Sequence, residues 1–381
     1  MKILHVVPTY LPAWRYGGPI RSVHGLAKAL VNRGHEVYVY TTNIDGPNVL
    51  DVPTNTPVNI DGILVYYFPC EVLLRRLYIS KEMKIRALCD IEKFDVIHLH
   101  SIFLWPTWMI SRLAIKNNIP YILSPRGMLI NKLIKKKNLI IKKIWIYLFE
   151  EKTIANAKYI HFTTKLEHDE FVRLNFQSKL FLTIPNGYEF HEEFNYKTLD
   201  LNKFENFSPP YIIFVGRVNW KKGLDRLIQA MKFISDCQLL VVGNNDGMME
   251  KLIDQVKNLD LKNRVHFIGE VDGEEKNDLI RKSKMLVLPS YSENFGNVLL
   301  EAMALGIPVA VTKDVGLVDD ILAHMTGVLL PDDPVGMGNK LAETLRNEEL
   351  LNKMGKAGYQ FSKNFSWDSI AIKFEKAYLI K

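Results

Sequence analysis

The 381-residue sequence is poor in cysteine, and the three cysteines that it has are far apart. Cys70, Cys89 and Cys237 belong to no CxxC pair and to no cluster with histidine. A disulfide framework and a zinc module are therefore both excluded as the basis of the fold. We expect a protein of a reducing compartment, the cytoplasm.

Long apolar runs are also missing. The best candidate for a spanning helix, residues 139–149, contains Lys142 and Lys143, whereas such a helix needs about 18 uncharged apolar residues. The apolar run at the N-terminus stops at Pro8, which is too short for the core of a signal peptide. We expect a first strand there, and any contact with a membrane to be peripheral.

Charge is distributed unevenly along the chain, whose formal net charge is +7. Residues 1–190 carry 25 Lys and Arg against 15 Asp and Glu, while residues 191–381 carry 24 against 27. Hydrophobic residues make up 48% of the sequence, the ordinary proportion for a globular protein with a core. The basic first half could attract nucleic acid, anionic lipid or a phosphorylated substrate.

Short β-branched runs alternate with amphipathic segments in both halves, which is the pattern of parallel βαβ units in an α/β fold. In the first half, the runs that we predict as strands are residues 2–7, 36–41, 95–99, 120–124, 159–162 and 180–184. In the second half, the predicted strands begin at residues 211, 238, 264, 285 and 307. Residues 188–210 show neither period and end in Pro209 and Pro210, which predicts a linker.

The segment SYSENFGNVLLEAMALGIPVAV, residues 290–311, carries the densest chemical signal. Gly296 precedes a helical run, and a turn that opens a helix offers free N–H groups and the positive end of the helix dipole to a diphosphate. Glu301 falls about one turn into that helix, where a carboxylate can accept ribose hydroxyls, and Glu293 stands in the preceding loop. Taken alone, this spacing favours a helix cap and a solvated helix residue.

A second motif, GRVNWKKGLDRLIQA at residues 216–230, follows the first strand of the same half and opens another helix. Arg217 and Lys222 can supply the positive charge that a diphosphate leaving group requires. Gly216 and Gly223 bracket the loop, and glycine lets a backbone approach a ligand closely. The two motifs together favour a diphosphate site over isolated surface charges.

Six motifs follow one another along the chain: YGGPIRSVHGLAKAL, DVIHLH, SPRGML, IPNG, GRxxxxKGxxxLIxA and LPSYSENFGNVLLEAMALGIPV. In this order they resemble the motifs of the retaining GT-B glycosyltransferases of family 4. The resemblance runs from Lys2 to the terminal NFSWDSIAIKFEKAYL. Within the family, the sequence is most similar to bacterial enzymes that build lipopolysaccharide, O-antigen, capsule or other exopolysaccharide.

The resemblance implies two Rossmann-like, doubly wound parallel-sheet domains that face a cleft. An acceptor-binding domain over residues 1–187 and a nucleotide-sugar-binding domain over residues 211–365 are expected, with a C-terminal helix at 366–381 packing back on the first. The implied activity is hexosyl transfer from a nucleotide-sugar to a glycan acceptor, expected to be lipid-linked. Retention of the sugar's anomeric configuration would follow if the acceptor attacks the face of the sugar that the phosphate leaves. The departing phosphate would then help to take the acceptor's proton.

The same resemblance assigns the donor site. Arg217 and Lys222 would bind the donor phosphates, and Glu301 the ribose. Glu293 would orient the transferred sugar rather than attack it. The full set of expected donor-binding residues is Gly17, Gly18, Gly216, Arg217, Lys222, Asn294, Phe295, Gly296, Asn297 and Glu301.

His100, at the end of the DVIHLH strand, aligns with the family's active-site histidine and would contact the transferred sugar. The expected catalytic set is Glu293, His100, Arg217 and Lys222. His98, two residues earlier on the same face of the strand, is the alternative to His100.

Two arginines are acceptor-side candidates. Arg126 follows a predicted strand and could hold an acceptor phosphate or a sugar oxygen, or equally form a structural ion pair. Arg21 lies in the YGGPIRSVHGLAKAL motif.

No metal ion or cofactor is expected, because Arg217, Lys222 and helix N-termini would stabilise the leaving phosphate and no DxD motif follows a predicted strand. One departure from the family lies in the loop after the strand at 307. Many relatives carry a glutamate there, where this sequence has Asp319 and Asp320. We assign neither of these aspartates a catalytic role.

Functions other than glycosyl transfer remain compatible with the sequence. Nucleotide-sugar epimerases and phosphorylases share the two-domain fold, although no cofactor lysine indicates a phosphorylase. A non-catalytic nucleotide-sugar binder and a nucleic-acid binder are the alternatives outside the enzymes, and we expect no nucleic-acid partner. The sugar, base, acceptor and linkage depend on pocket contacts that no motif fixes.

Residues 131–149 carry six lysines and no acidic residue. Read as a helix, they form an apolar stripe flanked by lysines and aromatics, the pattern of a helix in a lipid interface or of a domain helix whose lysines face water. A lipid-linked acceptor favours the interpretation as a helix in a lipid interface. We expect peripheral binding to the anionic inner face of the cytoplasmic membrane through Lys135, Lys136, Lys137, Lys142 and Lys143.

Overall fold

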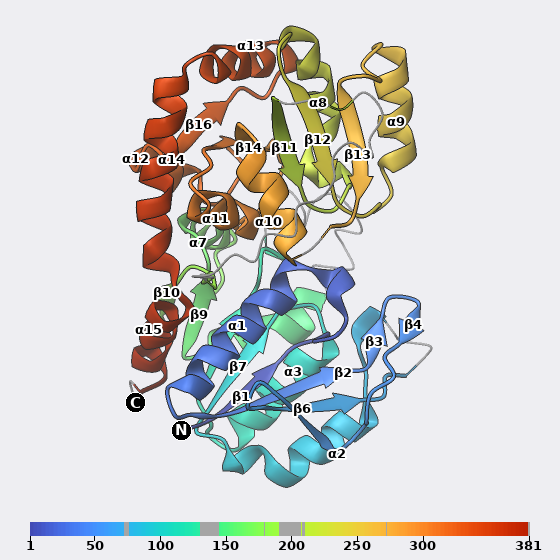
Figure 1. Cartoon of the computed structure of the whole chain (residues 1–381). Coiled ribbons are helices and arrows are strands. Elements are labelled where there is room, and N and C mark those ends of the chain that lie inside the picture. The colour runs from blue at the N-terminus through green and yellow to red at the C-terminus, as the bar shows by residue number, and fades with distance from the viewer. Residues whose placement is uncertain are drawn as a thin grey trace. The chain divides into compact units, whose positions relative to one another are not determined.

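The structure is a computed structural model that describes residues 1–71, 76–129, 145–178, 180–189, 207, 210–271 and 273–379 (Figure 1). The chain forms two compact units, one of Met1–Gly187 with Trp367–Lys381 and one of Tyr188–Ser366. Most of the predicted linker, residues 188–210, lies outside the described residues.

The N-terminal unit is built on a sheet of eight strands in the order β10-β9-β8-β7-β1-β2-β6-β5. Neighbours pair in parallel, except β5 with β6. The strands are β1 (Lys2–Val6), β2 (Glu36–Thr42), β5 (Pro57–Ile60), β6 (Ile63–Phe68), β7 (Val96–His100), β8 (Tyr121–Ser124), β9 (Tyr159–Phe162) and β10 (Phe181–Thr183), with a separate pair β3 (Ile44–Asp45) and β4 (Asn48–Val49). The strand order reverses between β1 and β7, and open α/β sheets bind ligands beyond the carboxyl ends of strands at such a point.

Helices accompany this sheet at the spacing that the sequence predicts. They are α1 (Gly18–Asn32), α2 (Lys81–Asp90), α3 (Trp105–Lys116), α6 (Glu151–Ala155), α7 (Lys165–Val172) and α15 (Trp367–Leu379), with short turns η1 (Trp14–Tyr16), η3 (Ile91–Lys93) and the π-helical η4 (Ile146–Glu150). In α1, the apolar face of Ile20, Val23, Ala27 and Leu30 is buried. Gly34 follows with φ of +85°, the left-handed conformation expected of a glycine after a helix.

The C-terminal helix α15 belongs to the N-terminal unit and packs beside α1 (Figure 1). The indole of Trp367 covers two glycines. A Cβ added at Gly25 would lie 2.2 Å from the ring, and one added at Gly187 would lie 2.4 Å from it. The chain can pass under Trp367 at these two positions only because they carry no side chain.

The C-terminal unit has a fully parallel sheet in the order β13-β12-β11-β14-β15-β16. Its strands are β11 (Tyr211–Val215), β12 (Gln238–Val242), β13 (Val265–Gly269), β14 (Met285–Leu288), β15 (Val309–Thr312) and β16 (Gly327–Leu330). Its helices are α8 (Leu224–Ala230), α9 (Met249–Asn258), α10 (Gly273–Lys282), α11 (Asn297–Ala304), α12 (Val318–Ala323), α13 (Pro334–Leu345) and α14 (Glu348–Ser362), with short turns η6 (Trp220–Lys222), η7 (Met231–Phe233) and η8 (Lys363–Phe365). Strands β14 and β15 are buried along their whole length, as expected when helices cover both faces of a parallel sheet.

The α/β class and the strand positions predicted from sequence are confirmed in both units, with three differences. The sequence analysis missed the small antiparallel pair β3-β4, the antiparallel hairpin β5-β6 and the last strand β16. Each unit nevertheless has the doubly wound topology of a Rossmann-like domain, with the strand order reversing in the N-terminal unit between β1 and β7 and in the C-terminal unit between β11 and β14.

No helix among the described residues is long and apolar enough to cross a membrane. The predicted interfacial segment falls mostly outside those residues, and with it Lys135, Lys136, Lys137, Lys142 and Lys143. In the described part, the Trp145 indole donates a hydrogen bond to Glu150 at 2.9 Å, while Leu148 is exposed. Trp145 is therefore held by a polar partner within its own unit, which the predicted apolar stripe did not foresee.

Candidate functional site

Most predicted donor residues of the C-terminal unit lie in the loops that follow β11 and β14, while Asn297 and Glu301 lie in α11, directly after the second loop. The loop after β12 joins them. Hydrogen bonds tie these loops together. Val218 N–H donates to Asn244 O at 2.8 Å, and Tyr291 N–H donates to Lys221 O at 2.7 Å. The two sequence motifs, about 70 residues apart, thus meet at the point where the strand order reverses.

Close backbone contacts between these loops require glycine at two positions. Gly243 has φ of +148°, and a Cβ there would lie 1.9 Å from Gly216 O. Gly223 has φ of +67°, and a Cβ there would lie 1.9 Å from Pro289 O. Any side chain would push the loops apart, so these glycines set the spacing of the site.

Lys222 and Glu293 form a hydrogen-bonded ion pair across two of the loops, and less than a fifth of either side chain is exposed. The backbone of Glu293 is fixed on both sides. Its N–H donates to Asp314 O at 3.0 Å, and its carbonyl accepts from Gly316 N–H at 2.9 Å. The loop after β15 therefore positions Glu293 through its backbone.

Asp319 and Asp320 are exposed in the first turn of α12, in the region where the sequence departs from the family pattern. The two residues that hold the Glu293 backbone, Asp314 and Gly316, precede them in the sequence.

Gly296 adopts a left-handed conformation, with φ of +84°, directly before α11. A Cβ there would lie 3.4 Å from Glu293 Cγ, so this turn runs beside the Glu293 side chain. Asn297 begins the helix, so the positive end of the helix dipole lies at this turn. Phe295 is buried in the core, so in this turn only its backbone can face a ligand.

The other charged donor residues also have partners of opposite charge. Glu301 is 2.7 Å from Lys276 of α10, and both side chains are largely buried. Arg217 is 3.2 Å from Asp246 in the loop after β12, and both are about half exposed. The sequence analysis missed Lys276 and Asp246, because no local pattern connects them to the motifs.

Arg226, another residue that the sequence analysis missed, lies buried beneath the site. Its guanidinium donates to Pro289 O at 2.8 and 2.9 Å and to Ser290 O at 2.9 Å, and it pairs with Asp332 at 2.9 Å. The Tyr291 ring stacks over it, with 4.1 Å from Cζ to the ring centroid. Arg226 therefore fixes the loop that carries Glu293.

In the N-terminal unit, a directed chain of hydrogen bonds runs through two histidines. Ile184 O can only accept, so His161 Nε2, at 2.8 Å, carries the proton. Neutral His161 then accepts at Nδ1 from the Ser124 hydroxyl at 2.6 Å. Ser124 in turn accepts from His98 Nε2–H at 2.7 Å, and His98 Nδ1 accepts from the Tyr378 hydroxyl of α15 at 2.9 Å.

A second chain passes through His100. Arg126 can only donate, so His100 Nδ1, at 3.1 Å from its Nη2, accepts. His100 Nε2–H then donates to His5 Nδ1 at 2.9 Å. His5 therefore carries its proton on Nε2, a buried atom without a hydrogen-bond partner in the part of the chain that the structure describes.

The four histidines are neutral at physiological pH. Burial lowers the pKa of His5 and of His161 to about 3, and it lowers the pKa of His98 and of His100 well below its usual value. The positive charge of Arg126 contributes to each shift in pKa.

His5, His98 and His100 each offer a ring nitrogen within 4.8 Å of the others, the spacing of a metal site. Both nitrogens of His98 and of His100 are already engaged in hydrogen bonds, and a guanidinium donates directly to His100. A metal ion would have to displace these bonds beside a positive charge. This donor set does not suit a metal.

The remaining predicted residues of this unit lie at the start of α1. Gly17 has φ of +67° directly before the helix, and a Cβ there would meet no atom within 4 Å. Gly18 is the first residue of α1. Arg21 is exposed, and its guanidinium lies over the Trp14 ring at 5.0 Å from the centroid.

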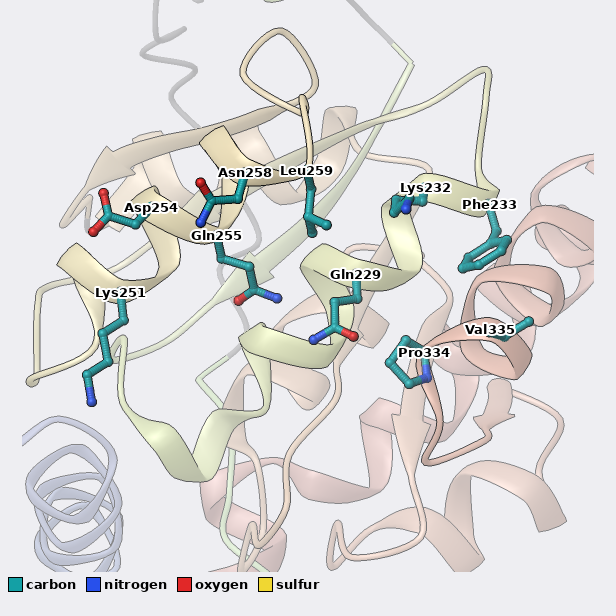
Figure 2. A pocket seen from close by; sticks show the side chains of 10 residues that line it. All are labelled: Gln229, Lys232, Phe233, Lys251, Asp254, Gln255, Asn258, Leu259, Pro334 and Val335. Carbon is teal, nitrogen blue, oxygen red and sulfur yellow. The ribbon is translucent and has the colours of Figure 1, made fainter.

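A hollow of about 590 Å³ lies elsewhere on the C-terminal unit, between α8, η7, α9 and the start of α13 (Figure 2). It is lined by polar groups such as Gln229 and Gln255 together with the apolar Phe233 and Val335. None of the predicted donor residues lines it, so this hollow does not identify the donor site.

Two family models match the chain. The model described as "Glycosyltransferase Family 4" matches residues 16–192, and the model described as "Glycosyl transferases group 1" matches residues 199–361. Each match falls largely on one of the two units.

Curated relatives are similar over most of the chain. An uncharacterized glycosyltransferase of Methanocaldococcus jannaschii, MJ1178, is 32% identical over 79% of this chain and 80% of its own length. A second glycosyltransferase from the same organism, MJ1607, is 29% identical over 100% of this chain and 98% of its own length. The N-acetyl-alpha-D-glucosaminyl L-malate synthase of Bacillus anthracis is 26% identical over 93% and 91%.

Solved structures share the fold. The sucrose-phosphate synthase from Thermosynechococcus elongatus matches with a TM-score of 0.75 and 22% identity, over 99% of this chain and 98% of that one. Anabaena HepE, solved with UDP and glucose, also matches with a TM-score of 0.75, at 17% identity over 99% and 98%. The two-sheet architecture described above is therefore the GT-B fold.

Acid is expected to destabilise the N-terminal unit, because the unfolded chain protonates histidines that the folded chain keeps neutral. Their folded pKa lies below the unfolded value, so this stabilisation is complete above about pH 6.5 and is lost as the pH falls toward 3. Each such histidine adds a slope of about 1.4 kcal/mol per pH unit in that window. Urea denaturation across the window should show a shallower slope for His161→Gln than for wild type. Equal slopes for the two proteins would contradict the neutral-histidine assignment.

Proposed function

This chain belongs to the glycosyltransferases of GT-B fold, and on that premise we propose that it moves a hexosyl group from a nucleotide-sugar to a glycan acceptor with retention of anomeric configuration. The observation that carries the proposal is the Lys222–Glu293 ion pair, where the loops after β11 and β14 meet beside the start of α11. Both the donor's phosphates and its sugar have a complementary group there. HepE, with UDP in its solved structure, supports a uridine nucleotide as the first donor to test.

Lys222 is proposed to bind the donor diphosphate. A phosphate oxygen arriving between Lys222 and Glu293 would take over the lysine's N–H donors and release the carboxylate. The freed Glu293 could then accept hydroxyls of the transferred sugar. Gly216 leaves room for this exchange, since a Cβ there would lie 3.7 Å from Lys222 Nζ.

The first-turn N–H groups of α11 and the half-exposed Arg217 would add positive potential at the phosphates. Together with Lys222 they would stabilise the charge that develops as the diphosphate leaves, so we propose that no metal ion is needed. The reaction would then continue in the presence of a chelator, and loss of activity in EDTA would refute this point.

The departing phosphate would take the acceptor's proton, on the same face of the sugar.

Glu301 is proposed to accept the ribose hydroxyls of the donor. Its contact with Lys276 at 2.7 Å holds the carboxylate in one orientation while leaving lone pairs for a second partner. Lys276 thereby becomes a positioning residue for the nucleotide.

His100 is proposed to contact the transferred sugar as a neutral imidazole. Arg126 fixes its Nδ1 as an acceptor, so the Nε2–H, now donated to His5, is the group that could turn toward a substrate oxygen. Arg126 and Arg21 remain the acceptor-side candidates. An epimerase or a non-catalytic binder of the same fold would leave the acceptor unmodified, which separates it from a transferase.

The acceptor is proposed to be lipid-linked, with the enzyme working at the inner face of the cytoplasmic membrane. Six lysines without an acidic residue in residues 131–149 support this, since each lysine near an anionic leaflet contributes about 1 kcal/mol. Cell-surface polysaccharide synthesis, lipopolysaccharide and O-antigen included, would be the setting.

Lys222→Ala should lower kcat about 100-fold or more, because a contact to developing charge is worth roughly 3 to 4 kcal/mol in the transition state. Glu293→Gln should behave similarly. Lys284→Ala, which removes a lysine from an exposed pair with Glu348 in the same unit, is the matched control and should keep full activity. Release of sugar from the nucleotide-sugar in the presence of acceptor is the measurement. Turnover near the wild-type level in Lys222→Ala would remove the donor-site assignment.

Glu301→Ala should weaken donor binding instead, because ribose hydroxyls change little during the reaction. The KM for the donor is expected to rise by more than kcat falls, while Glu348→Ala, taken from the exposed pair with Lys284, leaves both unchanged. The measurement is the KM and kcat of each variant from steady-state kinetics at varied donor concentration. A fall in kcat at unchanged KM would mean that Glu301 takes part in the chemistry.

The protein should sediment with anionic lipid vesicles at low salt and dissociate as salt is added. Replacing Lys135, Lys136 and Lys137 with Gln should reduce the bound fraction without changing nucleotide binding. If wild-type protein ignores anionic vesicles at low salt, the membrane proposal is refuted and the basic half must serve a soluble phosphorylated acceptor.

A further inference from the structure

Arg126 gathers three parts of the N-terminal unit at the carboxyl edge of its sheet. It lies directly after β8, with φ of +56°, and its guanidinium donates to residues from three other segments. These are Ser22 Oγ of α1 at 3.1 Å, Asn186 Oδ1 at 3.0 Å and His100 Nδ1 at the end of β7 at 3.1 Å. The guanidinium is thus fixed beside His100 by its surroundings.

None of these three partners carries a negative charge. Ser22 offers a hydroxyl, Asn186 an amide oxygen and His100 the lone pair of a neutral ring. Among the described residues, no carboxylate lies within ion-pair distance of Arg126, so the structural ion pair left open by the sequence is not formed. Burial lowers the pKa of its guanidinium only to about 10, so the group stays charged at neutral pH.

Glu167, the carboxylate whose charge acts on Arg126, has other partners. Glu167 accepts hydrogen bonds from the backbone N–H of Gly127 at 2.6 Å and of Thr163 at 2.9 Å. It raises the pKa of Arg126 through space without touching it. A positive charge that is partly removed from water and lacks a counterion is costly, and its cost falls when an anion binds.

The guanidinium also has N–H donors that these three contacts do not use. An arginine has five N–H donors, and the three contacts account for three of them. Nε has no hydrogen-bond partner in the described part of the chain. Arginine binds carboxylate and phosphate through paired donors, so the unused ones suit an oxyanion better than a single sugar hydroxyl.

We infer that Arg126 binds an anionic group of the acceptor, a phosphate or a carboxylate, next to His100. The inference rests on the proposed function and names the chemical class of its acceptor. The same chemistry could come from the donor's diphosphate. The acceptor is favoured because Lys222, Arg217 and the α11 N-terminus, all in the other unit, already supply the positive charge that the proposed donor site requires.

The test uses inorganic phosphate as the probe and the full-length protein saturated with UDP, so that the donor's diphosphate site is occupied. Binding is measured by calorimetry at constant ionic strength, with chloride replacing phosphate in the reference. Phosphate should bind to the wild type with UDP present, and Arg126→Gln should weaken that binding at least tenfold, or about 1.4 kcal/mol. Arg86→Gln, which removes an arginine that already pairs with Asp90 at 2.6 Å, is the matched control and should bind phosphate like wild type.

A second variant keeps the guanidinium and blocks the site. Asn186→Asp would place a carboxylate about where the amide oxygen now lies, 3.0 Å from Arg126 Nη1. It should weaken phosphate binding as Arg126→Gln does, while supplying the missing counterion and thus preserving the fold. It therefore decides the question even if Arg126→Gln does not fold.

Three results would overturn the inference. They are no phosphate binding to wild type, equal binding in wild type, Arg126→Gln and Asn186→Asp, and loss of phosphate binding when UDP is added. The last would assign Arg126 to the donor's diphosphate. If wild type does not bind UDP, the proposed donor fails, while phosphate binding compared between wild type and the two variants without UDP still decides whether Arg126 binds an anion.

Discussion

The ion pair between Lys222 and Glu293 joins the two loops that carry the residues proposed to bind the donor's phosphates and sugar in the C-terminal unit. Its position depends on glycines that let backbones touch: Gly223 runs against Pro289 O, and Gly243 runs against Gly216 O. Arg226 holds the second loop from beneath. The fold thus brings opposite charges together at the carboxyl edge of the sheet, where we propose that a diphosphate competes for the lysine and releases the glutamate.

The N-terminal unit solves a different electrostatic problem. It keeps four buried histidines neutral beside a guanidinium. Ile184 O, which can only accept, fixes His161 in the Nε2–H form, and Arg126, which can only donate, fixes His100 in the same form. His98 and His5 take the Nε2–H form through the hydrogen bonds that follow from these two. Tyr378 ends one of these chains from the C-terminal helix, which is held over α1 by Trp367 on Gly25. The last helix is therefore part of the polar interior around His98, and not merely a cover.

Much of this could be predicted from the sequence, because local signals carried it. Buried β-branched runs located β1, β7 and β11, and the position of His100 at the end of β7 followed from one motif. The hairpin β5-β6 was missed because it breaks the βαβ alternation, although Asp61 and Gly62 form its left-handed turn.

Contacts between distant residues left no local trace. Tyr378 and His98 are 280 residues apart, and Lys276 and Glu301 belong to different helices. Arg126 could be recognised from the SPRG motif as a residue of interest. That its partners are all uncharged depends on where Ser22 and Asn186 meet in space, which no spacing in the sequence reveals.

The central claim is that the C-terminal unit binds a nucleotide-sugar where Lys222 meets Glu293. The most direct test is a panel of nucleoside diphosphates and nucleotide-sugars scored by the thermal stabilisation of the full chain. A ligand at about one hundred times its Kd should add about 2.7 kcal/mol to the free energy of unfolding. The account predicts such a shift for at least one nucleotide in the wild type and a much smaller one when Lys222 and Glu301 are both replaced by alanine. Absence of a shift with every nucleotide, or a shift that the double replacement leaves intact, would contradict it.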